Sequence, residues 1–318
     1  MEQKISTRQL SFVKKWWISS RPFSFPASTM SVVFGTAVAV FYSGSGFNLW
    51  YFILAFFGMA ILHAASNILS DVFDYRKGLD REPAPVSGGV VRGIITQKEA
   101  LTGSTILFVT GTGIGLVLVY FTGLPLLYIG VTGLIIGIFY TSNNNFNLKY
   151  HALGDLAVFL NFGILGSLGA FYIQTGYLSW IPVIWAIPIS LLVIGILHAN
   201  NWRDIVTDQA GKISTVASVL GDKGSQIYYG GLLFLPYILI TGYILVPGYI
   251  FPGLPAMPYS FFLVFLGLPL AVQLYKKAMN RRKPVQPFDF IALDGATAQF
   301  NLIFGLLCTL ALVVYGIL

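Results

Sequence analysis

The sequence predicts an all-α membrane protein in which about nine transmembrane helices form a bundle around a central cavity. The composition is the first reason. The 318 residues are 56% hydrophobic and only 10% charged, with a mean hydropathy of +0.75, which lies far outside the usage of soluble domains. The second reason is that apolar runs of about 20 residues, long enough to cross a bilayer, recur along the whole chain. We therefore expect a single polytopic membrane domain over residues 1–318.

The expected spans follow one another with turn-forming segments between them. Gly and Pro mark several boundaries, as at Gly123–Pro125 and Pro247–Pro258, where the chain must reverse direction. A motif that occurs twice suggests two related helical halves, about 1–145 and 146–318. The expected spans are roughly 22–43, 48–70, 98–121, 124–142, 153–175, 179–201, 224–246, 259–277 and 296–317.

The positive charges are confined to alternate loops, which predicts the orientation of the chain. Lys and Arg precede the first span and fill the loops after the second, fourth, sixth and eighth, whereas the intervening loops carry no charge. Because cytoplasmic loops carry the excess of Lys and Arg, we expect a protein of the cell membrane with a cytoplasmic N-terminus. The net charge of +7 would then face anionic membrane lipid. Basic patches with interleaved aromatic residues are missing, so we expect no nucleic-acid partner.

Half of the twelve acidic residues gather in two places, both on the predicted cytoplasmic side. Asn67 and Asp71 repeat the spacing of Asn200 and Asp204, and residues four apart on a helix share one face. Mg²⁺ binds through one or two carboxylates together with substrate phosphates, so two such stripes could hold a diphosphate between them. The polar segments Tyr75–Thr96 and Thr207–Ser225 follow the clusters and are expected to cap them. The two clusters are Asp71, Asp74 and Asp80, and Asp204, Asp208 and Asp222.

Loss of a diphosphate explains why carboxylates, cations and aromatic residues would occur together. The leaving group accumulates negative charge, which bound Mg²⁺ neutralises as a Lewis acid, and nearby Lys and Arg add charge-assisted hydrogen bonds. If the departing carbon is allylic, the resulting cation must be kept from water in an aromatic-lined cavity. Asp155 has two interpretations, an acid favoured at a helix N-terminus or a substrate contact.

Two segments resemble the Asp-rich motifs of the UbiA superfamily of intramembrane prenyltransferases. Asn67–Asp74 (NILSDVFD) is similar to the first motif and Asn201–Asp208 (NWRDIVTD) to the second. The likeness covers nearly the whole chain, and within the superfamily it is strongest to 1,4-dihydroxy-2-naphthoate polyprenyltransferases. The chain departs from the common pattern where Ser70 precedes Asp71 in place of Asn, and it lacks an Arg-bearing segment that many naphthoate enzymes have.

The resemblance implies Mg²⁺-dependent transfer of a polyprenyl group from an allylic isoprenyl diphosphate to a small aromatic acceptor. The acceptor implied is 1,4-dihydroxy-2-naphthoate, in menaquinone biosynthesis. Two Mg²⁺ ions would bind with the diphosphate. The implied catalytic and metal-binding residues are Asp71, Asp74, Asp204 and Asp208, and the substrate-binding residues are Asn67, Arg21, Lys77, Asp80, Tyr140, Lys149, Asp155, Asn200, Arg203 and Lys212.

Other functions stay open at this point. The acceptor could be 4-hydroxybenzoate, geranylgeranylglyceryl phosphate, or a haem or chlorophyll precursor. A cation-coupled transporter would also use carboxylates and duplicated helices, although here the carboxylates cluster at one membrane face instead of the midplane. The sequence does not indicate the length of the isoprenoid chain, the oligomeric state, or whether a side chain acts as general base.

Overall fold

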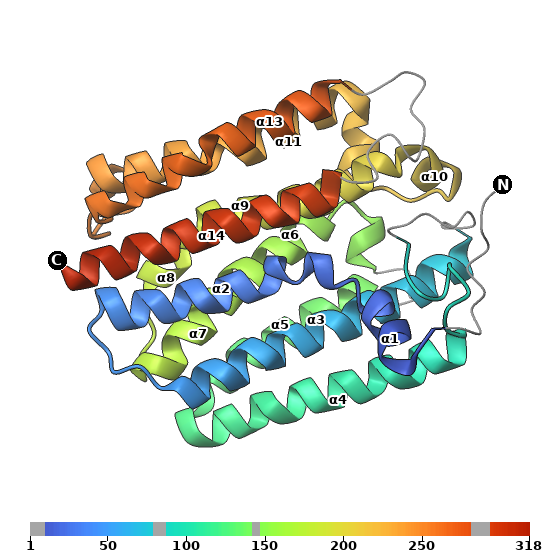
Figure 1. The fold of residues 1–318 in the computed structure, drawn as a ribbon, viewed down its shortest axis with the longest axis horizontal. Coiled ribbons are helices and arrows are strands. Elements are labelled where there is room, and N and C mark those ends of the chain that lie inside the picture. Colours follow the sequence, from blue (N-terminus) through green and yellow to red (C-terminus); the bar gives the residue numbers. More distant parts are fainter. Residues whose placement is uncertain (1–9, 79–86, 142–146, 281–292) are drawn as a thin grey trace.

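The computed structural model describes residues 10–78, 87–141, 147–280 and 293–318, and the regular elements in these ranges are all helical. The long helices run side by side as a bundle, with α1 and α10 at one end (Figure 1). The elements are α1 (Phe12–Ser20), η2 (Pro22–Ser24), α2 (Pro26–Ala37), η3 (Val38–Tyr42), α3 (Leu49–Lys77), α4 (Gln97–Thr122), α5 (Leu124–Thr141), η4 (Leu148–Tyr150), α6 (Gly154–Val158), η5 (Phe159–Leu165), α7 (Gly166–Thr175), α8 (Trp180–Trp185), α9 (Ile187–Arg203), α10 (Ile205–Ala210), α11 (Val216–Leu245), α12 (Pro247–Ile250), η6 (Tyr259–Gly267), α13 (Leu268–Met279) and α14 (Leu293–Ile317).

Seven of the described segments are long and apolar enough to cross a membrane. The all-helical membrane fold is therefore confirmed, but the expected number of nine spans is not. The spans expected at 124–142 and 179–201 are shorter helices. The first is apolar over Leu124–Tyr140. The second is divided into α8 and α9, because the chain bends at Ala186 and Pro188 opens the second part.

The two halves of the bundle are joined by α2, which packs against α3, α7 and α14. The larger core lies in the second half, where α9 packs between α11 and α14 around Trp185, Trp202 and Phe300. A smaller core in the first half joins Ile68 and Val72 of α3 to the segment before α4. The end of α9 is thus packed into the larger core and the end of α3 into the smaller one.

The helix ends that carry the acidic motifs differ between the halves. Helix α3 runs through Asp71 and Asp74 and ends only at Lys77, where Gly78, with a φ of 72°, forms the left-handed cap. The expected span ended at residue 70, because charged residues marked the boundary in the sequence. Helix α9 instead ends at Arg203, and Asp204 leaves helical geometry before α10 begins. The repeated spacing therefore does not produce the same local structure twice.

Candidate active site

One cavity at the end of the bundle is lined by acidic residues from both halves. Asp74 comes from α3, whereas Asp204 and Asp208 come from the end of α9 and from α10. The cations Arg21 and Lys149 line the same space. We call this space the acidic cavity. Its other lining residues are Tyr150, Asn200, Asn201, Thr207, Ile213 and Thr215.

Asp74 is held by an ion pair and two hydroxyl groups. Its Oδ2 lies 2.5 Å from Lys149 Nζ and accepts a hydrogen bond from Ser70 Oγ, and its Oδ1 accepts from the Tyr150 hydroxyl at 2.8 Å. Both charged side chains are largely buried, with 16% of Lys149 and 10% of Asp74 exposed. Burial is the largest single influence and would lower the pKa of Lys149, but Asp74, Tyr150 and Tyr140 together raise that pKa above its ordinary value. Lys149 is therefore a firmly charged ammonium group inside the cavity.

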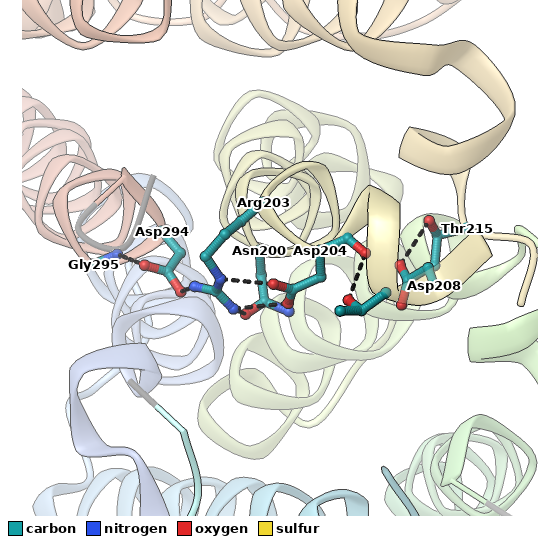
Figure 2. Close-up of polar contacts among 8 residues, drawn as sticks. Asn200, Arg203, Asp204, Asp208, Thr215, Asp294 and Gly295 are labelled. Carbon is teal, nitrogen blue, oxygen red and sulfur yellow. Dashed lines mark hydrogen bonds and ion pairs between the residues drawn. The ribbon is translucent and has the colours of Figure 1, made fainter. Parts of the chain in front are cut away.

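Asp204 belongs to a buried network that links α9 to α14 (Figure 2). Arg203 donates to both oxygens of Asp204 at 2.9 Å and to Asp294 Oδ2 at 2.9 Å. The same guanidinium donates to Asn200 Oδ1, and Gly295 N caps the other oxygen of Asp294. Arg203 and Asp294 are only 5% and 2% exposed. The network fixes the orientation of the Asp204 carboxylate at the cavity wall.

Asp208 lies in α10, one turn after Asp204, and lines the same acidic cavity. Its Oδ2 accepts a hydrogen bond from Thr215 Oγ1 at 3.3 Å, and Thr215 also forms the capping box of α11 with Ser218. Burial, and next the charge of Asp204, raise the pKa of Asp208 to about 7. Asp208 is thus poised to lose a proton when a cation enters.

The acidic cavity adjoins a second space, which we call the aromatic chamber, and that space adjoins a third, which we call the apolar chamber. The aromatic chamber, of about 130 Å³, shares Arg21, Lys149 and Asn200 with the acidic cavity. The rings of Phe23, His63, Tyr140 and Phe162 line it. The apolar chamber, of about 280 Å³, shares Ser66, Gly137, Asn161 and Phe162 with the aromatic chamber and lies among α3, α4, α5 and α7. The three spaces thus follow one another, from carboxylates past aromatic rings to aliphatic walls.

The carboxylates of the acidic cavity suit a hard cation that is also held by its substrate. Among the residues that the structure describes, no three carboxylate, His or Cys side chains are grouped so as to hold a metal ion by themselves. Mg²⁺ needs only one or two carboxylates when phosphate oxygens supply the rest. Asp74, Asp204 and Asp208 therefore fit Mg²⁺ that arrives with a phosphorylated ligand.

A family model matches most of this chain. The model of the UbiA prenyltransferase family aligns with residues 31–293. The chain belongs to the UbiA prenyltransferase family. It is accordingly a prenyltransferase and an integral membrane protein.

Named relatives and solved structures agree with this family. A UbiA prenyltransferase domain-containing protein 1 homolog of Drosophila melanogaster is 33% identical over 94% of this chain and 79% of its own length. UbiA prenyltransferase domain-containing protein 1 of Homo sapiens is 31% identical over 91% and 80%. The apo structure of a UbiA homolog from Aeropyrum pernix K1 has a TM-score of 0.63 at 17% identity, covering 93% of this chain and 98% of that one. A UbiA homolog from Archaeoglobus fulgidus bound to GPP and Mg²⁺ has a TM-score of 0.61 at 15% identity, covering 95% and 98%.

Several predicted site residues of this UbiA family member lie away from the acidic cavity. Asp71 is 3% exposed and accepts a hydrogen bond from Val90 N at 2.7 Å, in the segment before α4. Lys77 lies over the Tyr150 ring, 3.8 Å from its centroid. Lys212 is exposed on the turn after α10, and Asp155 is buried against Tyr228. Asp80 falls outside the described residues.

The remaining predicted residues, except Arg203, line the acidic cavity or the aromatic chamber. Asn67 and Tyr140 line the aromatic chamber. Asn67 also donates to Ser20 O at 2.9 Å and to Ser24 Oγ at 3.0 Å, and so holds the corner that carries Arg21. Arg203 is buried beneath Asp204, where it braces the wall of the cavity.

Sequence reasoning missed three residues of the site in this UbiA-family prenyltransferase. They are Tyr150, which donates to Asp74; Thr215, which donates to Asp208; and Asp294, which binds Arg203. Asp294 could have been suspected, because it is an acid at the start of the last apolar run. Tyr150 and Thr215 carry no comparable signal, since their partners are distant in sequence or lie beyond a turn.

Proposed function

We propose that this prenyltransferase moves a polyprenyl group from an allylic isoprenyl diphosphate to a small aromatic acceptor, with Mg²⁺ as cofactor. The acceptor that we favour is 1,4-dihydroxy-2-naphthoate, in the biosynthesis of a menaquinone-type quinone at the cytoplasmic side of the cell membrane. The observation that carries the proposal is that Asp74, Asp204, Asp208 and Lys149 line one cavity, which adjoins the aromatic chamber and, beyond it, the apolar chamber. The fold shared with a homolog bound to GPP and Mg²⁺ supports it.

The acidic cavity would hold the diphosphate. Asp74, Asp204 and Asp208 would bind two Mg²⁺ ions, which neutralise the charge on the departing diphosphate. Arg21 and Lys149 line this cavity and would donate charge-assisted hydrogen bonds to the phosphate oxygens. Because Lys149 forms an ion pair with Asp74, its ammonium group is positioned before the substrate arrives.

The aromatic chamber would hold the reacting carbon atoms. Phe23, Tyr140 and Phe162 line it and would shield an allylic cation from water, and aromatic rings attract a cation. An acceptor ring with hydroxyl groups is electron-rich and attacks without a strong base. With 1,4-dihydroxy-2-naphthoate, the carbon that is attacked then loses carbon dioxide.

The apolar chamber would hold the isoprenoid tail. Its aliphatic and glycine-rich walls lie among α3, α4, α5 and α7, and it connects with the aromatic chamber around Asn161 and Phe162. Burying an isoprenoid removes apolar surface from water, which provides binding energy without specific polar contacts. We therefore expect geranylgeranyl or longer diphosphates to be better substrates than dimethylallyl diphosphate.

The test is transfer of a labelled group by purified protein in lipid nanodiscs. Geranylgeranyl diphosphate and Mg²⁺ are supplied with 1,4-dihydroxy-2-naphthoate, 4-hydroxybenzoate or geranylgeranylglyceryl phosphate, and the prenylated product is identified by mass. We expect product with the naphthoate, and its loss in Asp74→Asn and Asp204→Asn. Asp222→Asn is the matched control, because Asp222 binds the indole of Trp202 and does not line the acidic cavity.

Two outcomes would contradict the proposal. Product with only one of the other acceptors would reassign the acceptor and leave the diphosphate chemistry in place. Cation flux into sealed vesicles, without any prenylated product, would favour the transporter that the sequence left open.

A further inference from the structure

We propose that Asp71 is a positioning residue, which anchors the segment Ser87–Ile95 over α3 instead of binding metal. We call Ser87–Ile95 the cap segment. This inference rests on the proposed function, because it divides the acidic residues of that site into metal ligands and an anchor. Asp71 Oδ2 accepts from Val90 N at 2.7 Å, while Asp74, Asp204 and Asp208 line the acidic cavity. The carboxylate of Asp71 is thus directed at the cap segment.

The cap segment is shaped to cover this carboxylate closely. A Cβ on Gly88 would overlap the Asp71 carboxylate, so only glycine allows the backbone to approach this far. The turn is closed by backbone hydrogen bonds from Arg92 N to Gly88 O and from Ile94 N to Gly89 O. Gly93 has a φ of 65°, which lets the turn reverse. Asp71 therefore binds a preformed turn through one of its backbone donors.

The cap segment also packs against the two helices beside it. Val90, Ile94 and Ile95 are buried in one small core with Ile68 and Val72 of α3. Trp16 and Ile18 of α1 pack against the same core. The cap segment is consequently wedged between α3 and α1, with Asp71 fixing its position along α3.

The contacts continue from the cap segment to Arg21, one of the cations proposed to bind the diphosphate. Gly89 lies so close to Ser19 that a Cβ there would overlap the Ser19 side chain. Two residues later, Arg21 takes a φ of 53° and sends its side chain to the acidic cavity and the aromatic chamber. Asn67, one turn before Asp71, holds the same corner through Ser20 O. Asp71 thus acts on the diphosphate indirectly, because it holds the cap segment against the corner of the chain that positions Arg21.

The test compares Asp71→Asn and Asp71→Ala with Asp74→Asn. Hydrogen exchange of residues 87–95 is measured without metal, and Mn²⁺ affinity is measured with a non-reactive isoprenyl thiodiphosphate. The side-chain oxygen of Asn can still accept from Val90 N, so Asp71→Asn should keep wild-type protection and wild-type Mn²⁺ affinity. Asp71→Ala should speed exchange at Val90 on the order of 10-fold, the loss expected when one buried hydrogen bond is removed. It should also raise KM for the diphosphate.

A second variant separates the anchor from the charge. Gly88→Ala leaves Asp71 intact but pushes the cap segment away, so it should reproduce the exchange and KM of Asp71→Ala without weakening Mn²⁺ binding. Loss of Mn²⁺ affinity in Asp71→Asn as large as that in Asp74→Asn would overturn the inference, and so would unchanged exchange in Asp71→Ala. Unchanged Mn²⁺ affinity in Asp74→Asn would count against the proposed function. The exchange data would still show whether Asp71 anchors the cap segment.

Discussion

The buried contact between Arg203 and Asp294 makes a quantitative prediction about stability. Arg203 lies between Asp204 and Asp294, each 2.9 Å away, and the Asp294 side chain is 3% exposed. Arg203→Met keeps the length and apolar stem of the side chain but leaves Asp294 charged and without its cation. Removing one partner of a buried ion pair costs about 3–5 kcal/mol. Asp204 adds little to this loss, because 22% of its side chain is exposed and water can reach it.

A second substitution should then restore stability. In Arg203→Met with Asp294→Asn, no buried charge is left without a partner, so we expect the double variant to be more stable than Arg203→Met alone. Asp294→Asn by itself should cost about 1–3 kcal/mol, since Arg203 keeps Asp204 and loses one charged acceptor. Thermal unfolding of the four proteins in one detergent gives the comparison as a double-mutant cycle. Additive losses, with the double variant the least stable of the four, would refute this reasoning.

Three further predictions concern the acidic cavity and the apolar chamber. Because Mg²⁺ binds an ionised carboxylate and the pKa of Asp208 is raised to about 7, the Mg²⁺ requirement of turnover should increase as the pH falls through about 7. A Mg²⁺ titration that is independent of pH would count against this. Gly115→Leu should fill the apolar chamber and favour geranyl over geranylgeranyl diphosphate, because a Cβ at Gly115 meets open space and lines that chamber. Gly113→Leu on the same helix is the control, since Gly113 is exposed and does not line it. Tyr150→Phe removes the hydroxyl that binds Asp74 at 2.8 Å and should slow turnover about 10-fold, whereas an unchanged rate would show that Asp74 needs no such support.

The fold was predictable from the sequence because its causes are local. Apolar length and the alternation of charged loops predicted a helical membrane bundle with the acidic motifs at one end. The number of spans was less predictable, since a bend at Ala186 and an opening Pro188 divide one expected span into α8 and α9. Helix α3 was predicted too short because charge was read as the end of the span, whereas its glycine cap lies at Gly78.

The acidic cavity was predictable only in part, because its contacts join distant segments. The composition and the motif spacing singled out Asp74, Asp204 and Asp208. The same spacing also singled out Asp71, because the pattern along one helix face does not reveal which other segment of the chain covers each residue. The contact of Asp71 with Val90 depends on how the chain returns before α4. The contact of Arg203 with Asp294 depends on the packing of α14 beside α9, which no local pattern records.

The central claim is that acidic residues from both halves of the chain bind one metal-associated diphosphate. The most direct measurement is a structure of the protein with Mn²⁺ and a non-reactive isoprenyl thiodiphosphate, in which anomalous scattering locates the metal. We predict metal peaks between Asp74 on one side and Asp204 and Asp208 on the other, with the isoprenoid tail in the apolar chamber. Metal and diphosphate bound elsewhere, or bound by only one of the two halves, would contradict the account.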